Sequence, residues 1–180
     1  LRLPDIRRPT DLTILERLMR AFPALSDHTS WGAEFSRELN ATDDRPLFGT
    51  RGLPVIEGKH VEPFVARIDT TRRIERRLAR QRMPDHRFER ARLGYRDVAG
   101  VGNRLSLIAA IVPAHVVSTH TLFCLRTAVA VDAQFFLCGI LNSYVLNALA
   151  RMLMGGHLTT ALVEGLPVPR PDGSRAQRTI

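Results

Sequence analysis

The sequence predicts an α+β fold, in which a mixed or antiparallel sheet with hairpins is combined with an N-terminal helix and a long C-terminal core helix. Three patterns predict this fold class. Near the N-terminus, apolar residues recur at helical spacing. In the middle of the chain, short runs of alternating apolar residues are separated by glycine and proline. Toward the C-terminus, a long apolar stretch again has helical spacing.

The N-terminal part is expected to form a helix and then short strands. Thr10 can cap a helix, because its hydroxyl can accept a hydrogen bond from a free backbone amide, and Pro23 ends this helix. Apolar residues then alternate over 31–39, which predicts a strand. Val55–Ile56 begin another short strand, which Gly58 interrupts.

A basic helix is expected next. Thr70 or Thr71 can cap a helix that continues to Arg82. Ile74 and Leu78 are four positions apart and give this helix a thin apolar stripe. Most of the remaining surface of the helix is arginine.

The following residues predict a hairpin and two further strands. Residues 93–98 and 105–111 form the two strands of the hairpin, and 100–103 form its turn. The short apolar runs at 116–117 and 121–125 are typical of additional strands.

One long helix is expected near the C-terminus. Asp132 can cap this helix, which continues to about Met154 and ends at Gly155–Gly156. The apolar residues expected on its buried side are Phe136, Ile140, Leu141, Val145, Leu149 and Leu153. A short segment at 166–169 completes the domain, which is expected to cover residues 1–170, with a mobile tail over 171–180.

Composition places the chain among ordinary globular domains. Hydrophobic residues make up 44% and charged residues 24% of the 180 residues, which argues against disorder. The apolar stretch over 128–154 contains too many polar residues for a membrane span. Cys124 and Cys138 lie in apolar surroundings and are expected to be buried, reduced thiols of a cytoplasmic protein.

The basic residues are concentrated in one block. The formal net charge is +8, and residues 67–96 alone hold eleven arginines against four acidic residues, a net charge of +7. A GC-rich genome would enrich arginine everywhere and does not explain such a block. A focused basic patch is typical of proteins that bind a polyanion such as nucleic acid, here through a flexible basic excursion at 67–92. The alternative is a solvated helix face on which Glu75 and Glu89 make local ion pairs.

Catalytic and metal-binding motifs are not recognisable. Gly52 to Lys59 lacks the spacing of a phosphate-binding loop, and Gly100-x-Gly102 is followed by a predicted strand where a nucleotide-binding turn needs a helix. His115, His120 and Cys124 match no standard zinc spacing. We therefore expect no catalytic residues and no metal site.

Eight stretches occur in an order and spacing that carry a resemblance. They are 31–35, 37–44, 53–60, 95–99, 103–113, 141–143, 155–158 and 166–169, from Trp-Gly-Ala-Glu-Phe to Leu-Pro-Val-Pro. Together they resemble the C-terminal specificity region of type IIG restriction–modification enzymes and related adenine-specific DNA methyltransferases. The ending is also similar to target-recognition domains of type I restriction specificity subunits. The resemblance covers roughly residues 5–170.

The resemblance implies sequence-specific recognition of double-stranded DNA. A separate catalytic domain of the same polypeptide would then flip an adenine out of the duplex and methylate it with S-adenosylmethionine. The Gly-rich cofactor loop and the Asp/Asn-Pro-Pro-Tyr/Phe signature of that domain do not occur here, and the sequence starts at Leu1. We therefore expect a non-catalytic fragment without a cofactor of its own. The family often has a longer segment where this chain has its arginine block.

The candidate DNA-contacting residues combine the charge and the resemblance. Phosphate contacts are expected from Lys59, His60, Arg72, Arg73, Arg76, Arg77 and Arg80, and further contacts from Arg96, Asn103, Arg104 and His157. Arg96 can instead pair with Asp97 and hold the hairpin. Two other functions remain open: a protein-interaction domain whose basic arm docks on an acidic partner, and an RNA-binding domain. Aromatic residues are only 6%, which disfavours a base-stacking platform for single strands.

Overall fold

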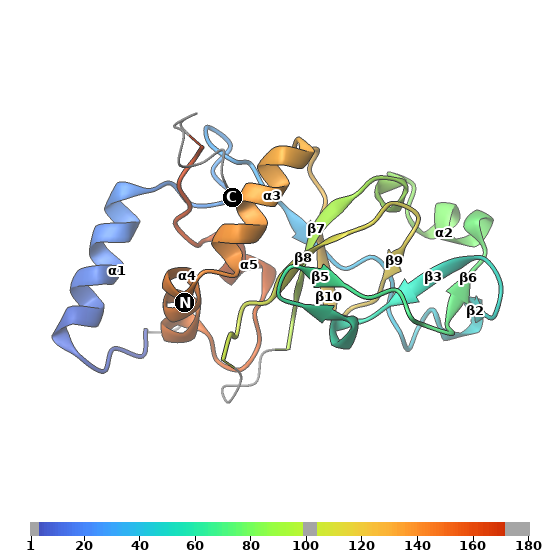
Figure 1. Ribbon diagram of the computed structural model, residues 1–180, viewed down its shortest axis with the longest axis horizontal. Coiled ribbons are helices and arrows are strands. Elements are labelled where there is room, and N and C mark those ends of the chain that lie inside the picture. Colours follow the sequence, from blue (N-terminus) through green and yellow to red (C-terminus); the bar gives the residue numbers. More distant parts are fainter. Residues whose placement is uncertain (1–3, 99–103, 172–180) are drawn as a thin grey trace.

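The computed structural model describes residues 4–98 and 104–171 and has the expected α+β fold. The turn expected at 100–103 and the tail expected after Pro171 lie outside these residues. Helix α1 (Pro9–Ala21) lies at one end of an elongated molecule, next to α4 (Tyr144–Leu153), whereas α2 (Arg76–Arg82) lies at the other end (Figure 1). Helices α3 (Val131–Leu141) and α5 (Thr160–Glu164) lie between them, nearer to α4.

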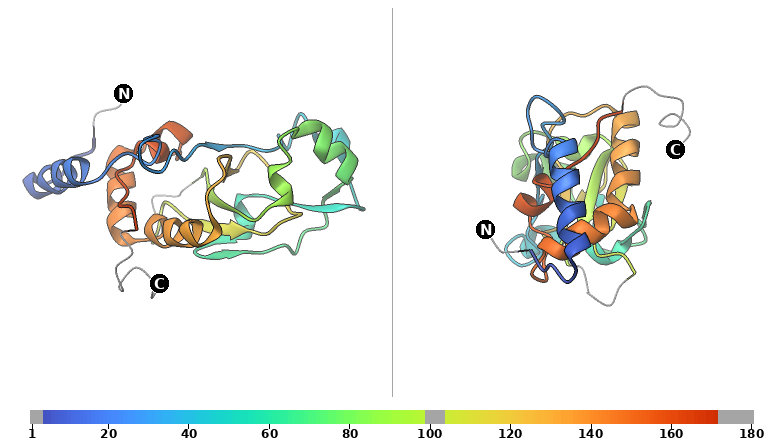
Figure 2. Two further views of the ribbon diagram at one scale, coloured as in Figure 1. Left: turned by 90° about the horizontal axis from the view of Figure 1, so that it is seen from above. Right: turned by 90° about the vertical axis from the view of Figure 1, so that its left-hand side faces the viewer.

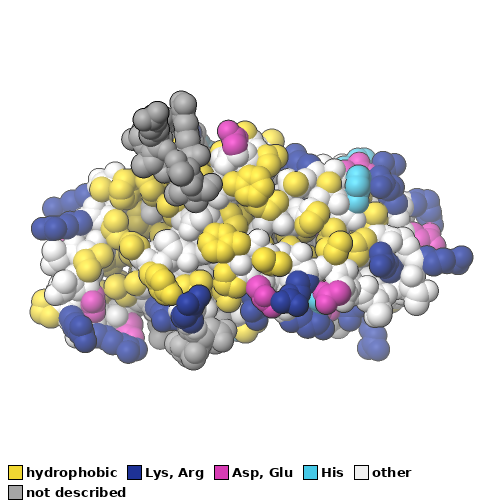
Figure 3. Space-filling view, in the orientation of Figure 1, with side chains coloured by type: hydrophobic (Ala, Val, Ile, Leu, Met, Phe, Trp, Pro, Cys, Tyr) yellow, Lys and Arg dark blue, Asp and Glu magenta, His cyan; other side chains and the backbone are white. Residues whose placement is uncertain are grey.

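The two ends differ in how their helices are attached. Figure 2 shows α1 extending from the body next to α4, and no residue of α1 is fully buried. Leu15 and Leu18 pack part of their surface against the core, while Leu12, Ile14 and Met19 remain exposed. In the space-filling view, the middle of the visible face is largely apolar, and Lys and Arg side chains lie at both ends, including the end that carries α2 (Figure 3).

The larger sheet is antiparallel and has the order β1-β10-β7-β8. Its strands are β1 (Phe35–Ser36), β10 (Leu122–Leu125), β7 (Arg92–Arg96) and β8 (Ala109–Val112). The pairing of β7 with β8 confirms the predicted hairpin, although β8 begins at Ala109 and not at Leu105. The strand predicted over 31–39 shrinks to β1, because Gly32 has a left-handed backbone and closes a turn on Asp27.

A second, mixed sheet forms the α2 end, with the order β2-β6-β3-β9. Its strands are β2 (Phe48–Gly49), β6 (Arg73–Ile74), β3 (Leu53–Ile56) and β9 (Val117–Ser118). Strand β6 lies between β2 and β3 and is antiparallel to both, and β3 pairs in parallel with β9. A small ribbon of β4 (Val61–Glu62) and β5 (Val65–Ala66) and the 3-10 turns η1 (Arg45–Leu47), η2 (Gly58–His60) and η3 (Arg87–Glu89) complete the strand-rich part.

The helix predicted from Thr70 or Thr71 begins only at Arg76. Arg73 and Ile74 belong to β6, which is paired on both sides. Ile74 is fully buried in a core cluster beneath α2 together with Ala79, Met83 and other apolar residues. This burial outweighs the local preference for helix, and the basic segment is packed into the fold rather than forming a flexible excursion.

The predicted long C-terminal helix is two helices, α3 and α4, bent by 66° at the junction between them. The Ser143 hydroxyl accepts a hydrogen bond from the amide of Leu146 and starts α4. The side chain of Asn142 donates to the carbonyl of Ala109 and accepts from its amide, which joins the junction to β8. Val145, expected to be buried, is 57% exposed because the bend turns α4.

The apolar helices α3 and α4 are relevant to the question of membrane insertion. Across residues 4–98 and 104–171, no single helix is long and apolar enough to span a membrane. Only α3 and α4 taken together, across their bend, reach that length and apolarity.

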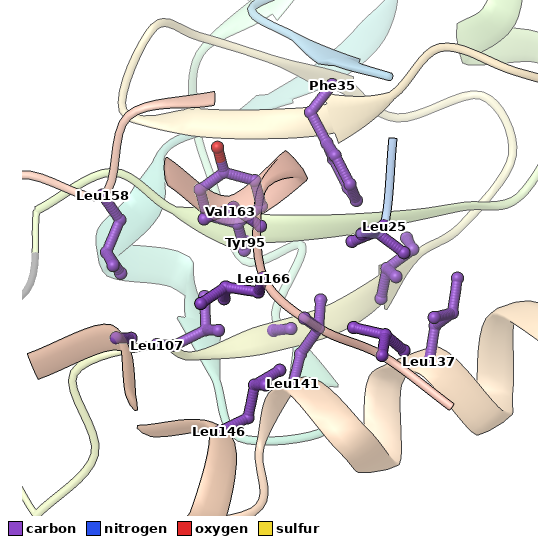
Figure 4. Packing of buried hydrophobic residues seen from close by; sticks show 14 of the residues in the cluster. Leu25, Phe35, Tyr95, Leu107, Leu137, Leu141, Leu146, Leu158, Val163 and Leu166 are labelled. Atoms are coloured by element: carbon purple, nitrogen blue, oxygen red, sulfur yellow. The ribbon is translucent and has the colours of Figure 1, made fainter. Parts of the chain in front are cut away.

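The principal core lies between the larger sheet and helices α3, α4 and α5. Leu107, Leu137, Leu141 and Leu146 pack there against Tyr95 and other residues of the sheet (Figure 4). Two smaller clusters lie around β8 and β10 and beneath α2. Both cysteines are free and buried, as predicted.

Candidate nucleic-acid interface

Two of the eleven arginines in the basic block are structural. Arg92 is 1% exposed, and its Nε and Nη2 both donate to the carboxylate of Glu38 at 2.6 Å. Arg87 is 8% exposed, and its Nη1 donates to the Ser36 hydroxyl at 2.7 Å. These guanidinium groups join β1, β7 and the loop before β9, so neither is available to a ligand.

Five further arginines of the block each pair with an acidic residue. Arg76 and Arg80 of α2 share the carboxylate of Glu89, at 3.1 Å and 2.8 Å. The remaining three pairs are Arg67 with Glu62 at 3.0 Å, Arg82 with Asp44 at 2.5 Å and Arg72 with Glu57. Glu89 is already counted in the net charge of +7, whereas Glu62, Asp44 and Glu57 lie outside the block and offset part of that charge.

Several exposed arginines have no acidic partner in the described part of the chain, and we call four of them at the α2 end the arginine face. They are Arg45 of η1, Arg51 between β2 and β3, Arg73 of β6 and Arg77 of α2. Arg45, Arg51 and Arg77 are exposed. The Nη1 of Arg73 lies 3.5 Å from the carbonyl oxygen of Gly52. Unneutralised guanidinium groups gathered on one end of a molecule can bind phosphate oxygens by two-point hydrogen bonds.

A second cationic site lies where η2 meets the end of β7. Glu57, Lys59 and Arg96 line a hollow of about 220 Å³ there. The Nζ of Lys59 lies 3.0 Å from Glu57, whereas Arg96 pairs with no carboxylate among the residues that the structure describes. Partial burial raises the pKa of Glu57, but Lys59 and Arg72 outweigh this effect and leave the pKa below its ordinary value. The carboxylate is therefore held ionised between two cations, and Arg96 adds a further positive charge.

The other predicted contacts are scattered. The Nδ1 of His60 accepts a hydrogen bond from the amide of Glu57 at 2.9 Å, so this ring braces η2. His157 is exposed, and its Nδ1 lies 3.5 Å from Asp97.

Arg104 lies 5.9 Å from the ring centre of Tyr144 in α4, at the end of the molecule opposite to α2 (Figure 1). Asn103 lies outside the described residues. The structure thus places Arg73 and Arg77 at the same end and brings Lys59 and Arg96 to one hollow, but leaves Arg104 apart from α2.

Sequence reasoning missed Arg45 and Arg51. Both lie outside the basic block, and the charge count therefore did not select them. A signal was present for Arg51, which stands between Thr50 and Gly52 in a sequence typical of an exposed turn. No such signal separates Arg76, which Glu89 neutralises, from Arg77, which it does not.

The remaining candidates are a metal site and the two cysteine thiols. Within 4–98 and 104–171, no three histidine, cysteine, aspartate or glutamate residues are placed to hold a metal ion. Burial raises the pKa of Cys124 and of Cys138 to about 11, which keeps both thiols protonated near neutral pH.

Comparison of the chain with models of known protein families found no match, and comparison with curated proteins found none either.

Proposed function

We propose that this chain is a sequence-specific recognition module for double-stranded DNA, belonging to an adenine-specific DNA methyltransferase or restriction–modification enzyme. In this proposal the catalytic domain lies elsewhere in the same polypeptide and carries S-adenosylmethionine. The observation that supports DNA binding is the arginine face, where Arg45, Arg51, Arg73 and Arg77 present guanidinium groups that no described carboxylate neutralises. The assignment to methyltransferases rests on the resemblance of the sequence stretches.

The arrangement of the arginine face supports binding to a phosphate backbone. Its residues come from η1, the β2–β3 connection, β6 and α2, all of which pack on one core cluster. Guanidinium groups on a rigid support lose less conformational freedom on binding than groups on a flexible arm. Binding to DNA releases counterions, so the affinity must fall steeply with salt concentration.

A salt-scanned fluorescence-anisotropy titration with a duplex tests the proposal. If Arg45, Arg73 and Arg77 of the arginine face neutralise about three phosphates, the slope of log affinity against log salt is roughly −2.7. The double variant Arg73→Gln with Arg77→Gln removes two contacts and should flatten this slope by about 1.8. Because phosphate contacts position the protein without reading sequence, binding should weaken for all duplexes alike.

The matched control is Arg17→Gln with Arg20→Gln, which removes the same charge from α1 at the other end of the molecule (Figure 1). This control should keep a slope close to that of the unchanged protein. Equal slopes for both double variants would contradict the proposal, because binding would then follow net charge alone.

Competitors separate the alternatives. Displacement of the duplex by an acidic polypeptide at lower concentration than by unlabelled duplex would favour a protein-interaction domain. Stronger displacement by RNA would favour an RNA-binding domain.

A further inference from the structure

The connection between β2 and β3 has an unusual path. Strand β6 lies between these two strands, and Phe48 of β2 and Leu53 of β3 both pair with Ile74 of β6. The three residues Thr50–Gly52 must therefore carry the chain from one side of β6 to the other. This connection belongs to the end of the molecule opposite to α1, where β2, β6 and the start of β3 lie (Figure 1).

The base of the connection is fixed to β6. Gly52 has a φ of +100°, a backbone conformation that side chains disfavour, and a Cβ at this position would lie 2.3 Å from the carbonyl oxygen of Ile74. Ile74 itself is fully buried. On the outside, Arg73 Nη1 approaches the Gly52 carbonyl at 3.5 Å. The connection is thus held against a packed strand.

The connection carries one long polar side chain, that of Arg51. Gly49, Thr50, Arg51 and Gly52 are all exposed. A Cβ at Gly49 would meet nothing within 4 Å, so this position adds no bulk next to Arg51. No described residue makes an ion pair or side-chain hydrogen bond with Arg51. Arg73, the residue of the arginine face that lies in β6, has its guanidinium beside the carbonyl of Gly52.

We propose that the β2–β3 connection enters the major groove of bound DNA and that Arg51 reads the edge of a guanine. This inference rests on the proposed DNA-binding function. The major groove is about 12 Å wide and admits a two-stranded ribbon, and a segment flanked by glycines is no bulkier. Arginine donates two parallel hydrogen bonds to O6 and N7 of guanine, which is the commonest specific contact of this kind. Arg73 and Arg77, which lie on the adjoining β6 and α2, take the flanking phosphates.

Selection from a random duplex library, followed by titration of the selected duplex and its single-base variants, tests the inference. The unchanged protein should prefer G·C at one position by about five- to 150-fold. Arg51→Gln should abolish this preference at that position only. Arg51→Lys keeps the charge and should retain the salt slope while losing most of the discrimination, because an ammonium group lacks the two-point geometry.

Arg77→Gln is the matched control, since it removes a second exposed arginine of the same face. It should weaken binding to all duplexes while keeping the preference. A preference that Arg51→Gln leaves intact overturns the inference, and so does salt-dependent binding of the unchanged protein without any base preference. The first result leaves the proposed sequence-specific DNA binding standing. The second leaves DNA binding but removes its sequence specificity, and failure to bind any duplex removes both proposals. Arg51 is exposed, so its variants should have melting curves close to that of the unchanged protein, which a thermal melt of each variant checks.

Discussion

Glu38 is a buried carboxylate that accepts three hydrogen bonds. Its side chain is fully buried, and it accepts two hydrogen bonds from Arg92 and one from the amide of Ser118 at 2.7 Å. The Nε of Arg87 lies 3.7 Å away. One carboxylate thereby holds two cations of the basic block inside the fold, which explains why these arginines are not at the surface.

Glu38→Gln should destabilise the protein strongly. The substitution leaves the buried guanidinium of Arg92 without its counter-charge, and breaking a buried pair in this way costs about 3–5 kcal/mol. Urea unfolding followed by circular dichroism measures the change. The control is Glu34→Gln, which breaks a surface ion pair with Arg126 whose charged atoms are 3.7 Å apart. This variant should lose less than about 1 kcal/mol of unfolding free energy. Similar losses for the two variants would show that Glu38 does not have the role described.

At the scale of elements, the bend between α3 and α4 is stabilised by buried amide side chains. The Oδ1 of Asn147 accepts hydrogen bonds from the amides of Ser106 and Leu107, at 2.8 Å and 2.7 Å. Its Nδ2 donates to the carbonyls of Leu107 and Leu141. Asn147 thus satisfies the backbone that precedes β8, which has no strand partner at these positions, and ties it to α4.

Asn147→Leu should destabilise the fold although it replaces a polar residue in an apolar core. It leaves the buried amides of Ser106 and Leu107 without acceptors, and each buried unsatisfied group costs about 1–3 kcal/mol. Thermal unfolding measures the loss. Val145→Ala on the same helix should change stability by less than about 1 kcal/mol, because Val145 is exposed. An Asn147→Leu variant with unchanged thermal stability would contradict the role of these hydrogen bonds.

At the scale of the whole molecule, the two cysteines couple global stability to alkaline pH. Cys138 belongs to the principal core and Cys124 to the cluster around β8 and β10, and burial raises both pKa values to about 11. In the unfolded chain, thiols lose their protons near the ordinary pKa of about 8.5. Between these values the native state binds more protons than the unfolded state, so stability falls as pH rises.

The free energy of unfolding should therefore decline from about pH 8.5 toward pH 11. Urea unfolding at a series of pH values measures this decline. The double variant Cys124→Ala with Cys138→Ala should show a shallower decline, although its stability at pH 7 is lower because both sites are buried. An unchanged decline would mean that other groups, such as the buried Tyr95, whose pKa burial also raises, account for it.

The sequence by itself determined the features that depend on neighbours along the chain. Helical spacing and Pro23 located α1 to within a residue or two. The predicted hairpin located β7 and its pairing with β8, and a short apolar run located β10. The α+β class follows from these elements. The count of arginines also showed that one segment is unusually basic.

Tertiary structure decided the features that depend on residues distant in the sequence. Ile74 lies in a strand and not a helix because β2 and β3 flank it, and the long apolar stretch breaks into α3 and α4 because Asn142 and Asn147 bind backbone some 30 to 40 residues earlier. Charge pairing also depends on residues distant in the sequence. Arg92 and Glu38 are 54 positions apart, and only the folded chain brings them together. The folded chain likewise distinguishes the arginines that carboxylates neutralise from those that have no acidic partner in the described structure, such as Arg51 and Arg77. Ion pairing and burial are set by distance in space, which a one-dimensional pattern does not contain.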